Sequence, residues 1–220
     1  MNLNQTSGSN PSPDRRPIRI LIVDDHPLLR DGIAALLSGQ LDMEVVGEAS
    51  SGREGIELFR TQAPDVTLMD LQMPEMSGIE AIVAIRHESP EARFIVLTTY
   101  SGDVQVRRAL KAGAQAYLLK NVLQKELLAT IRTVHAGNKT MSPAVASELA
   151  EHYGEDSLTP REIDVLRLIA AGHANKEIAA QLSTTEETVK SRVKHILLKL
   201  HASDRTHAAV IGLKRGIIES

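Results

Sequence analysis

The chain has 220 residues, enough for one large domain or two small ones. Its hydrophobic fraction of 42% is ordinary for a globular protein, and because aromatic residues make up only 2%, any core must be aliphatic. No apolar run approaches the roughly 18 residues that a membrane helix needs, so we expect a cytoplasmic protein with no membrane partner. Cysteine is absent, which excludes disulfides and thiolate metal sites.

The net charge of −3 conceals an uneven distribution. Residues 157–220 carry ten Lys/Arg against seven Asp/Glu, a balance of +3, whereas residues 1–156 carry fifteen against twenty-one, a balance of −6. The positive balance of residues 157–220 indicates that this part of the chain binds an anionic partner such as nucleic acid. Ordinary surface variation is the alternative, and charge alone leaves both open.

Strand-like and helical patterns alternate along most of the chain, after a first segment that is rich in Asn, Ser and Pro. That segment, 1–17, is predicted to be a disordered leader. Five short β-rich runs then alternate with five helical patterns over 18–137, which predicts an α/β doubly wound fold with a five-stranded parallel sheet. The expected strands are 18–23, 44–48, 65–69, 93–97 and 116–119, and the expected helices are 28–37, 53–62, 79–87, 104–111 and 125–136.

A polar segment separates this part from the rest of the chain. Residues 138–157 are predicted to be an interdomain linker, with a helix that starts at Ser142-Pro143 and ends near His152. Beyond it, residues 158–220 show no strand pattern, and we expect an all-α domain. The expected helices are 160–171, 176–181, 186–200 and 205–214.

Several of these helices carry signals at their ends. Thr159, followed by proline and then by Glu162, predicts an N-cap with a capping box. Thr184 with Glu187 predicts a second capping box, and Gly172 predicts the end of the first helix. Residues 182–185 then form a tight turn between the second and third helices.

Polar side chains follow four of the predicted strands, where each strand ends. Asp24 and Asp25 follow the first strand, Asp70 the third, Thr98 the fourth and Lys120 the fifth. Because ligands of an open α/β sheet bind outside the C-terminal ends of its strands, we expect these side chains to share one rim. Taken singly, an Asp here is often a helix cap, a Thr a turn residue and a Lys a solvated charge.

Clustered carboxylates repel one another unless a cation neutralises them, and hard divalent ions such as Mg²⁺ take oxygen ligands. A metal site of this kind suits phosphoryl chemistry, in which one carboxylate acts as the nucleophile. One interpretation is a metal-dependent phosphohydrolase with Asp70 as a transient nucleophile. That enzyme would leave the basic helical part of the chain without a role.

The sequence runs around these residues resemble the receiver domain of two-component response regulators over about residues 18–137. The resemblance implies that Asp70 accepts phosphate from the phosphohistidine of a sensor histidine kinase. It also implies that Asp24, Asp25 and Asp70 bind Mg²⁺ together with the backbone carbonyl of Gln72. The runs are ILIVDDHP (20–27), MDLQMP (69–74), LTT (97–99) and YLLK (117–120).

The same resemblance assigns three further residues. Thr98 and Lys120 would contact the phosphoryl group. Tyr117 would be the switch aromatic, which moves inward as Thr98 moves toward the phosphate. A half-buried sheet tyrosine is the alternative for Tyr117.

The third helix of the last part, 186–200, has two unlike faces when projected at about 100° per residue. Its apolar face carries Val189, Val193, Ile196 and Leu200, and its opposite face carries Ser191, Lys194 and His195. A short helix, a tight turn and a helix with a basic outer face form a helix-turn-helix, whose second helix fits the major groove of DNA. A small helical bundle with a solvated basic face is the alternative.

The runs LTPRE (158–162), GHANKEIA (172–179) and ETVKSRV (187–193) resemble the LuxR-type domain of NarL/FixJ regulators over about residues 156–217. This resemblance implies a dimer surface around Thr206–Leu213. It implies base-edge contacts from Lys190, Ser191 and Lys194. Contacts with the DNA backbone would come from Asn175, Lys176, Thr188 and Lys199.

Together the two resemblances imply a DNA-binding transcriptional response regulator. It would be a regulatory protein and not an enzyme, although a receiver can catalyse its own phosphorylation and dephosphorylation. Phosphorylation of Asp70 would promote homodimer formation and release of the DNA-binding helix. A receiver that acts without phosphorylation is the remaining possibility, against which the complete acidic set argues.

Overall fold

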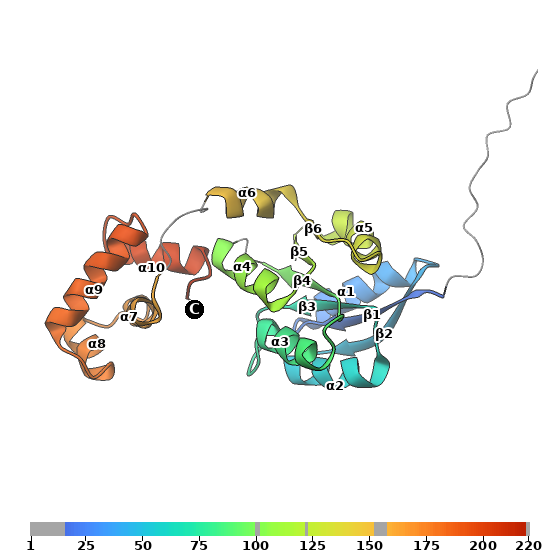
Figure 1. Cartoon of the computed structure of the whole chain (residues 1–220), viewed down its shortest axis with the longest axis horizontal. Helices are drawn as coiled ribbons and strands as arrows, with labels where there is room; N and C mark the ends of the chain where they lie inside the picture. Colours follow the sequence, from blue (N-terminus) through green and yellow to red (C-terminus); the bar gives the residue numbers. More distant parts are fainter. Residues whose placement is uncertain (1–15, 100–101, 122, 152–157, 219–220) are drawn as a thin grey trace, which may run out of the picture.

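The computed structural model describes residues 16–99, 102–121, 123–151 and 158–218, which form a sheet unit followed by a smaller helical unit (Figure 1). Most of the predicted leader, 1–17, lies outside the described residues. Every helix among the residues described is too short or too polar to cross a membrane.

The sheet is parallel throughout, and its strands lie in the order β2-β1-β3-β4-β5-β6. The chain passes from β1 to β2 on one side and then returns to β3 on the other side of β1. The sheet therefore has its switch point between β1 and β3, where open α/β sheets bind ligands. The strands are β1 (Ile18–Val23), β2 (Met43–Ala49), β3 (Val66–Asp70), β4 (Phe94–Thr98), β5 (Ala116–Leu119) and β6 (Thr140–Met141).

Helices cover both faces of the sheet, and alternate strand residues pack against each layer. In β1, Leu21 and Val23 join the core under α2, α3 and α4, whereas Ile20 and Ile22 join the core under α1 and α5. Burial on both faces explains why these strands read as continuous apolar runs. The helices are α1 (Pro27–Ser38), α2 (Gly52–Gln62), α3 (Gly78–Glu88), α4 (Asp103–Ala112) and α5 (Leu123–His135).

The prediction of five strands was wrong, because the structure has a sixth strand inside the predicted linker. Strand β6 is only two residues long and pairs with the open edge of β5, Tyr117 lying opposite Met141. A strand this short carries no period-two pattern, and it forms because β5 offers backbone groups that need partners. Helix α6 (Pro143–Glu151) follows and packs against α4, with Val145 fully buried.

The helical unit comprises α7 (Pro160–Ala170), α8 (Asn175–Gln181), α9 (Glu186–Lys199) and α10 (Arg205–Lys214), as the sequence predicted to within one residue. It has an aliphatic core of its own, to which every one of these helices contributes. The capping box at Thr159 and the left-handed Gly172 (φ 89°) are confirmed. The second predicted cap was wrong: helix α9 begins at Glu186, so its N-cap is Thr185, which accepts a hydrogen bond from the backbone of Thr188.

Candidate functional site

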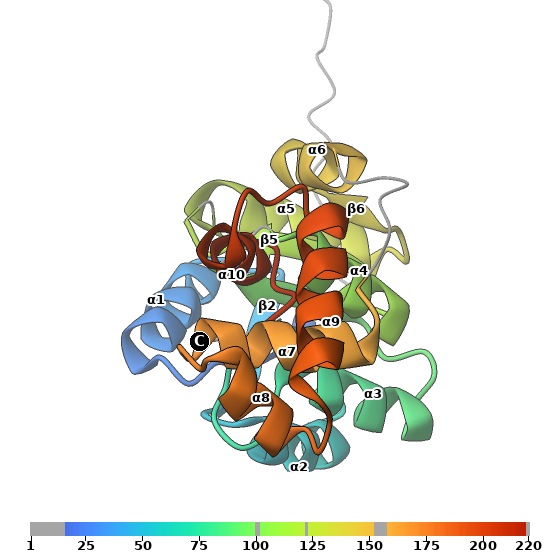
Figure 2. The same ribbon diagram turned by 90° about the vertical axis from the view of Figure 1, so that its left-hand side faces the viewer.

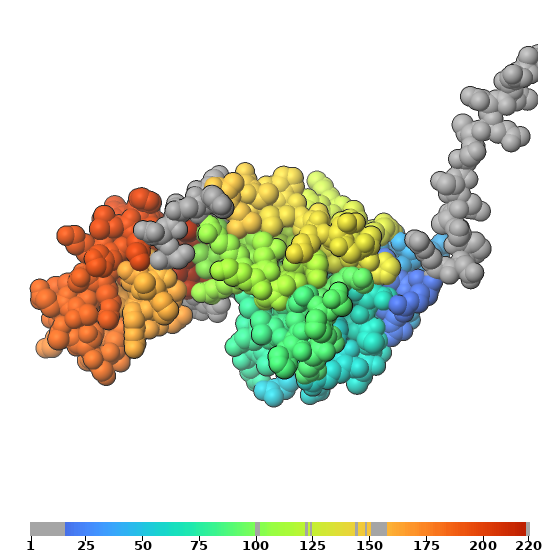
Figure 3. All heavy atoms as spheres, viewed as in Figure 1, coloured from blue at the N-terminus to red at the C-terminus, as the bar shows by residue number. Residues whose placement is uncertain are grey.

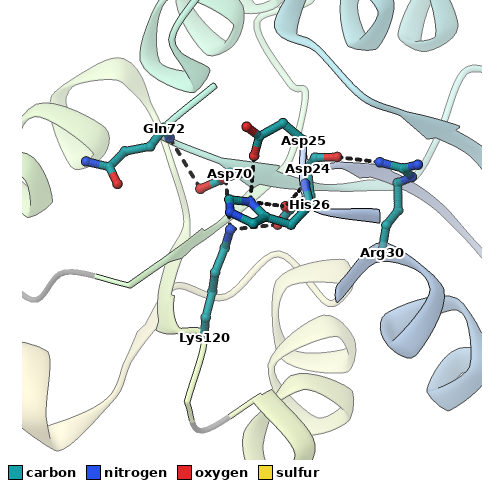
Figure 4. Close-up of polar contacts among 7 residues, drawn as sticks. All are labelled: Asp24, Asp25, His26, Arg30, Asp70, Gln72 and Lys120. Atoms are coloured by element: carbon teal, nitrogen blue, oxygen red, sulfur yellow. Dashed lines mark hydrogen bonds and ion pairs between the residues drawn. The ribbon is translucent and has the colours of Figure 1, made fainter. Parts of the chain in front are cut away.

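Three carboxylates meet at the C-terminal ends of β1 and β3, as the sequence predicted (Figure 4). Asp24 follows β1 and is fully buried, Asp25 is half-buried, and Asp70 ends β3 with 2% of its surface exposed. One ligand atom from each of these residues and from His26 lies within 4.8 Å of all the others. The juxtaposition arises because β1 and β3 are adjacent, with Val23 paired to Met69.

Lys120 extends from the end of β5 into this cluster. Its Nζ lies 2.8 Å from Asp70 Oδ2 and 2.9 Å from Asp24 Oδ2, with only 10% of the side chain exposed. Burial opposes the ammonium charge, but hydrogen bonds to Asp70 and Asp24 outweigh it and raise the pKa of Lys120. Burial raises the pKa of Asp70, and the bond from Lys120 acts in the opposite direction. The lysine therefore holds a positive charge where Asp70 needs one to ionise.

The carboxylates fit a hard divalent cation. Asp24 Oδ2 and Asp25 Oδ1 are buried oxygens that face Lys120 Nζ at 2.9 Å and His26 Nδ1 at 2.7 Å, respectively. One ammonium does not balance the charge of three clustered carboxylates, and a divalent cation with oxygen ligands would stabilise them further. This acidic cluster is therefore a candidate metal site.

His26 is a residue that sequence reasoning did not single out. Its Nδ1 lies 2.7 Å from Asp25 Oδ1, and its backbone N–H donates to Asp24 Oδ1 at 2.9 Å. Its position directly after Asp25 was the available signal. A single exposed histidine is normally uninformative, and only the fold shows that it faces the carboxylates.

The loop after β3 holds the Asp70 carboxylate in place. The exposed Gln72 donates its backbone N–H to Asp70 Oδ1 at 3.3 Å, and Gly78 donates its backbone N–H to the carbonyl of Leu71 at 3.1 Å. A Cβ on Gly78 would lie 1.9 Å from the Asp70 carbonyl oxygen. Glycine is thus required for the chain to return beside Asp70, a role that sequence reasoning did not identify.

Thr98 ends β4, Tyr117 lies opposite Val96 in the neighbouring strand β5, and both are fully buried. Their side chains share a hydrogen bond, and burial raises the pKa of Tyr117, which keeps the phenol neutral. The alternative of a half-buried tyrosine is wrong. In this structure the Tyr117 side chain lies inside the core formed with α4 and α6.

Helix α9 lies on the side of the helical unit away from the sheet, and it faces the viewer in Figure 2. Val189 and Ile196 are buried against the other helices, whereas Lys190, Ser191 and Lys194 are exposed. Lys190 Nζ lies 3.3 Å from Glu186 on the same helix. The structure therefore brings the three predicted base-reading residues onto one open surface.

The four predicted DNA-backbone contacts differ in their surroundings. Lys176 is exposed at the start of α8, and the half-buried Asn175 has a buried Oδ1 that accepts no hydrogen bond from the described residues. Thr188 is half-buried and hydrogen-bonded to Thr185. Lys199 forms an ion pair within the helical unit, because its Nζ lies 2.9 Å from the buried carboxylate of Glu162.

Both parts of the chain match known families. Residues 20–132 match the response regulator receiver domain, and residues 156–211 match the bacterial regulatory proteins of the luxR family. The transcriptional regulatory protein LiaR of Bacillus subtilis is 43% identical over 209 residues, which are 91% of this chain and 99% of LiaR. The nitrate/nitrite response regulator NarL of Escherichia coli K12 is 42% identical over 206 residues, 90% of this chain and 95% of NarL.

Solved structures of response regulators are similar over nearly the whole chain. The RcsB–DNA complex has a TM-score of 0.68 at 27% identity and covers 90% of this chain and 99% of RcsB. ChrA, from a heme-sensing two-component system, has a TM-score of 0.56 at 33% identity and covers 92% of this chain and 99% of ChrA.

Proposed function

This chain belongs to the response regulators that join a receiver domain to a LuxR-type DNA-binding domain, and we propose that phosphorylation of Asp70 controls its binding to DNA. The observation that supports this most is the buried Asp70 carboxylate, flanked by two further carboxylates and by the Lys120 ammonium. Its relatives are transcription regulators, and the chain is likewise a regulatory protein.

The reaction we propose is attack of an Asp70 carboxylate oxygen on the phosphorus of a phosphohistidine in a sensor kinase. The new O–P bond gives an acyl phosphate, the N–P bond breaks, and the kinase histidine leaves as neutral imidazole after it takes up a proton. Lys120 favours the ionised nucleophile and is placed to pair with a phosphoryl oxygen. The receiver would use the same groups for any autophosphorylation from a small donor.

Asp24, Asp25 and Asp70, with the backbone carbonyl of Gln72, would hold Mg²⁺ in this site. Bound there, Mg²⁺ supplies positive charge that offsets the charge of the transferred phosphoryl group. Thr98 would donate a hydrogen bond from its hydroxyl to the phosphoryl group. Its present hydrogen bond with Tyr117 would then be broken. We propose that Tyr117, the predicted switch aromatic, responds to this exchange of partners from its position in the core.

For DNA binding we propose base-edge contacts from the exposed Lys190, Ser191 and Lys194 in the major groove, where lysines meet guanine edges. Binding would involve a homodimer joined through the last helix, around residues 206–213, on double-stranded DNA in the cytoplasm. The proposed division of the chain is a leader at 1–17, the receiver at 18–137, a linker at 138–157 and the DNA-binding domain at 158–220. The proposed backbone contacts are Asn175, Lys176, Thr188 and Lys199.

Phosphoryl incorporation tests the proposal at its first step. The full chain is incubated with acetyl phosphate and Mg²⁺, and intact-mass spectrometry counts the phosphoryl groups on wild type and on Asp70→Asn. We expect one group on wild type and none on Asp70→Asn. The matched control Asp31→Asn changes an exposed carboxylate on α1 and should leave incorporation unchanged. Normal incorporation by Asp70→Asn would contradict the assignment.

A further inference from the structure

The sheet unit and the helical unit meet where the start of α4 contacts the turn after α10. Asp103 is the first residue of α4 and has 1% of its side chain exposed, and Arg215 directly follows α10 with 13% exposed. Arg215 Nε donates to Asp103 Oδ1 at 2.8 Å, and its Nη2 donates to Oδ2 at 3.0 Å. This is a bidentate, desolvated ion pair, the strongest geometry that an arginine and a carboxylate can adopt.

The backbones also come close at this point. Val104 donates its N–H to the Arg215 carbonyl at 3.3 Å, and its side chain packs against the core of the helical unit. A Cβ on Gly102 would lie 2.4 Å from the Arg215 carbonyl carbon. A Cβ on Gly216, which has a φ of 65°, would lie 2.4 Å from Gln105 Cγ. Two glycines therefore permit the approach that brings the charged pair together.

The rest of the contact is not closely packed. A pocket of about 210 Å³ lies between α4 and the helical unit, and both apolar and charged side chains line it, among them Leu158, Ile163, Ile217, Arg107, Arg108 and Lys111. Gln105 Oε1 is buried beside Gly216 and accepts no hydrogen bond from the described residues. The unfilled pocket and the unsatisfied acceptor both weaken this contact between the sheet unit and the helical unit. The bidentate Asp103–Arg215 pair and the packing of Val104 therefore hold the two units together at this point.

This contact leaves the DNA-reading surface uncovered. Helices α8 and α9 lie at the end of the molecule away from the sheet, and the red C-terminal end of the helical unit adjoins the green surface of α4 (Figure 3). Lys190, Ser191 and Lys194 are exposed while Arg215 is held. A domain held in this way is restrained at the end of its last helix and is not blocked at its reading helix.

We propose that the Asp103–Arg215 pair fastens the DNA-binding domain to the receiver and restrains α10 without masking α9. Asp103 lies five positions beyond Thr98 along the chain, at the start of the helix that follows β4. Movement of Thr98 toward a phosphoryl group would shift the start of α4 and separate Asp103 from Arg215. The separation of Asp103 from Arg215 rests on the proposed phosphorylation of Asp70. The attachment of the DNA-binding domain by this pair does not depend on that proposal.

The absence of cysteine from the sequence makes an inter-domain distance easy to measure. Cysteines are introduced at the exposed positions Glu57 on α2 and Ala170 on α7, spin labels are attached, and double electron–electron resonance gives the distribution of label distances. We expect one narrow distribution for the unphosphorylated full chain. We expect Arg215→Ala to broaden it at least twofold in width. The matched control Lys214→Ala removes the same charge from the adjacent exposed residue and should leave the distribution narrow.

A second variant tests the same contact without changing a charge. Gly102 has a φ of −53°, which alanine also adopts, so Gly102→Ala adds only a methyl group against Arg215. We expect it to broaden the distribution as Arg215→Ala does. A narrow distribution in both Arg215→Ala and Gly102→Ala would overturn the fastening.

Phosphoryl incorporation is counted on the same samples, so the two proposals can fail separately. If wild type takes up phosphate and its distance distribution broadens, release of the DNA-binding domain is supported. If wild type takes up phosphate and the distribution stays narrow, release is overturned. Wild type that takes up no phosphate overturns the proposed function, while Arg215→Ala still decides the fastening.

Discussion

Lys120 places its ammonium 2.8 Å from the Asp70 carboxylate, so the acceptor and a cation that can pair with phosphate are in contact before any phosphate arrives. The same ammonium lies 2.9 Å from Asp24. Lys120 therefore forms ion pairs with two of the carboxylates that we propose as metal ligands and offsets part of their negative charge. It must compete with a metal ion for their negative charge.

This competition gives the first prediction. Lys120→Ala should raise the affinity for Mg²⁺ several-fold, because the ion then meets carboxylates that no buried ammonium neutralises. The same variant should slow phosphoryl incorporation from acetyl phosphate about a hundredfold, as loss of a charge-stabilising donor typically does. Isothermal titration calorimetry and intact-mass time courses measure the two effects. Lys125→Ala removes an exposed lysine on α5 as a control, and a weaker Mg²⁺ affinity in Lys120→Ala would contradict the competition.

The second prediction concerns Gly78. Because a Cβ would lie 1.9 Å from the Asp70 carbonyl oxygen, Gly78→Ala should lower the free energy of unfolding by about 1–3 kcal/mol and slow phosphoryl incorporation. Urea unfolding followed by circular dichroism measures the loss. Gly32→Ala is the matched control, since nothing lies within 4 Å of its added Cβ in α1, and we expect a gain of about 0.5–1 kcal/mol there. Equal effects of the two substitutions would show that the close approach at Gly78 is unimportant.

A third prediction follows from Glu162, whose buried carboxylate joins the α7 capping box to Lys199. Burial opposes its charge, but hydrogen bonds from Lys199 and Thr159 outweigh this and lower the pKa of Glu162 below 4.5, its ordinary value. A lowered folded-state pKa means that the stabilisation is present above the unfolded value and is lost as the pH falls through the folded value. The free energy of unfolding of wild type minus that of Glu162→Gln should therefore shrink between about pH 6 and about pH 3.

The control for Glu162 is Glu91→Gln, which changes an exposed glutamate before β4. Its free energy of unfolding should differ little from that of wild type, because the Glu91 side chain is exposed. A constant difference for Glu162→Gln would show that the bond to Lys199 adds nothing to stability.

The open surface on α9 gives the fourth prediction. Lys194→Ala should weaken binding to an operator identified by selection about 10-fold to 100-fold and relax the preference at one base pair. Fluorescence anisotropy with single-base variants of the duplex measures both effects. Lys214→Ala is a control of equal charge away from α9. Weaker binding with an unchanged base preference would reassign Lys194 to a phosphate contact.

Much of the acidic site was predictable because strand order alone brings residues at the ends of β1 and β3 together. Asp24 and Asp70 are far apart in sequence, yet a parallel sheet with its switch point between β1 and β3 leaves them side by side. The helices of the last part were predictable from their apolar periodicity and, for α7, from its capping box, whereas the N-cap predicted for α9 was one residue off. These features follow from local pattern and from topology.

Other features depend on packing that no local pattern encodes. Strand β6 forms only because β5 presents an unpaired edge, and His26 faces the carboxylates only because of the turn after β1. Asp103 and Arg215 are 112 positions apart and belong to different units. Their pairing is a property of how the units meet, which the sequence of either unit does not determine.

The most direct test of the account is the change in DNA affinity on phosphorylation. The full chain is titrated onto its selected operator with and without acetyl phosphate, and Asp70→Asn is titrated in parallel. We expect phosphorylation to tighten binding by wild type about 5-fold to 150-fold, the range typical of coupling between two sites, and to leave Asp70→Asn unchanged. Equal tightening in Asp70→Asn, or none in wild type that carries one phosphoryl group, would contradict the account.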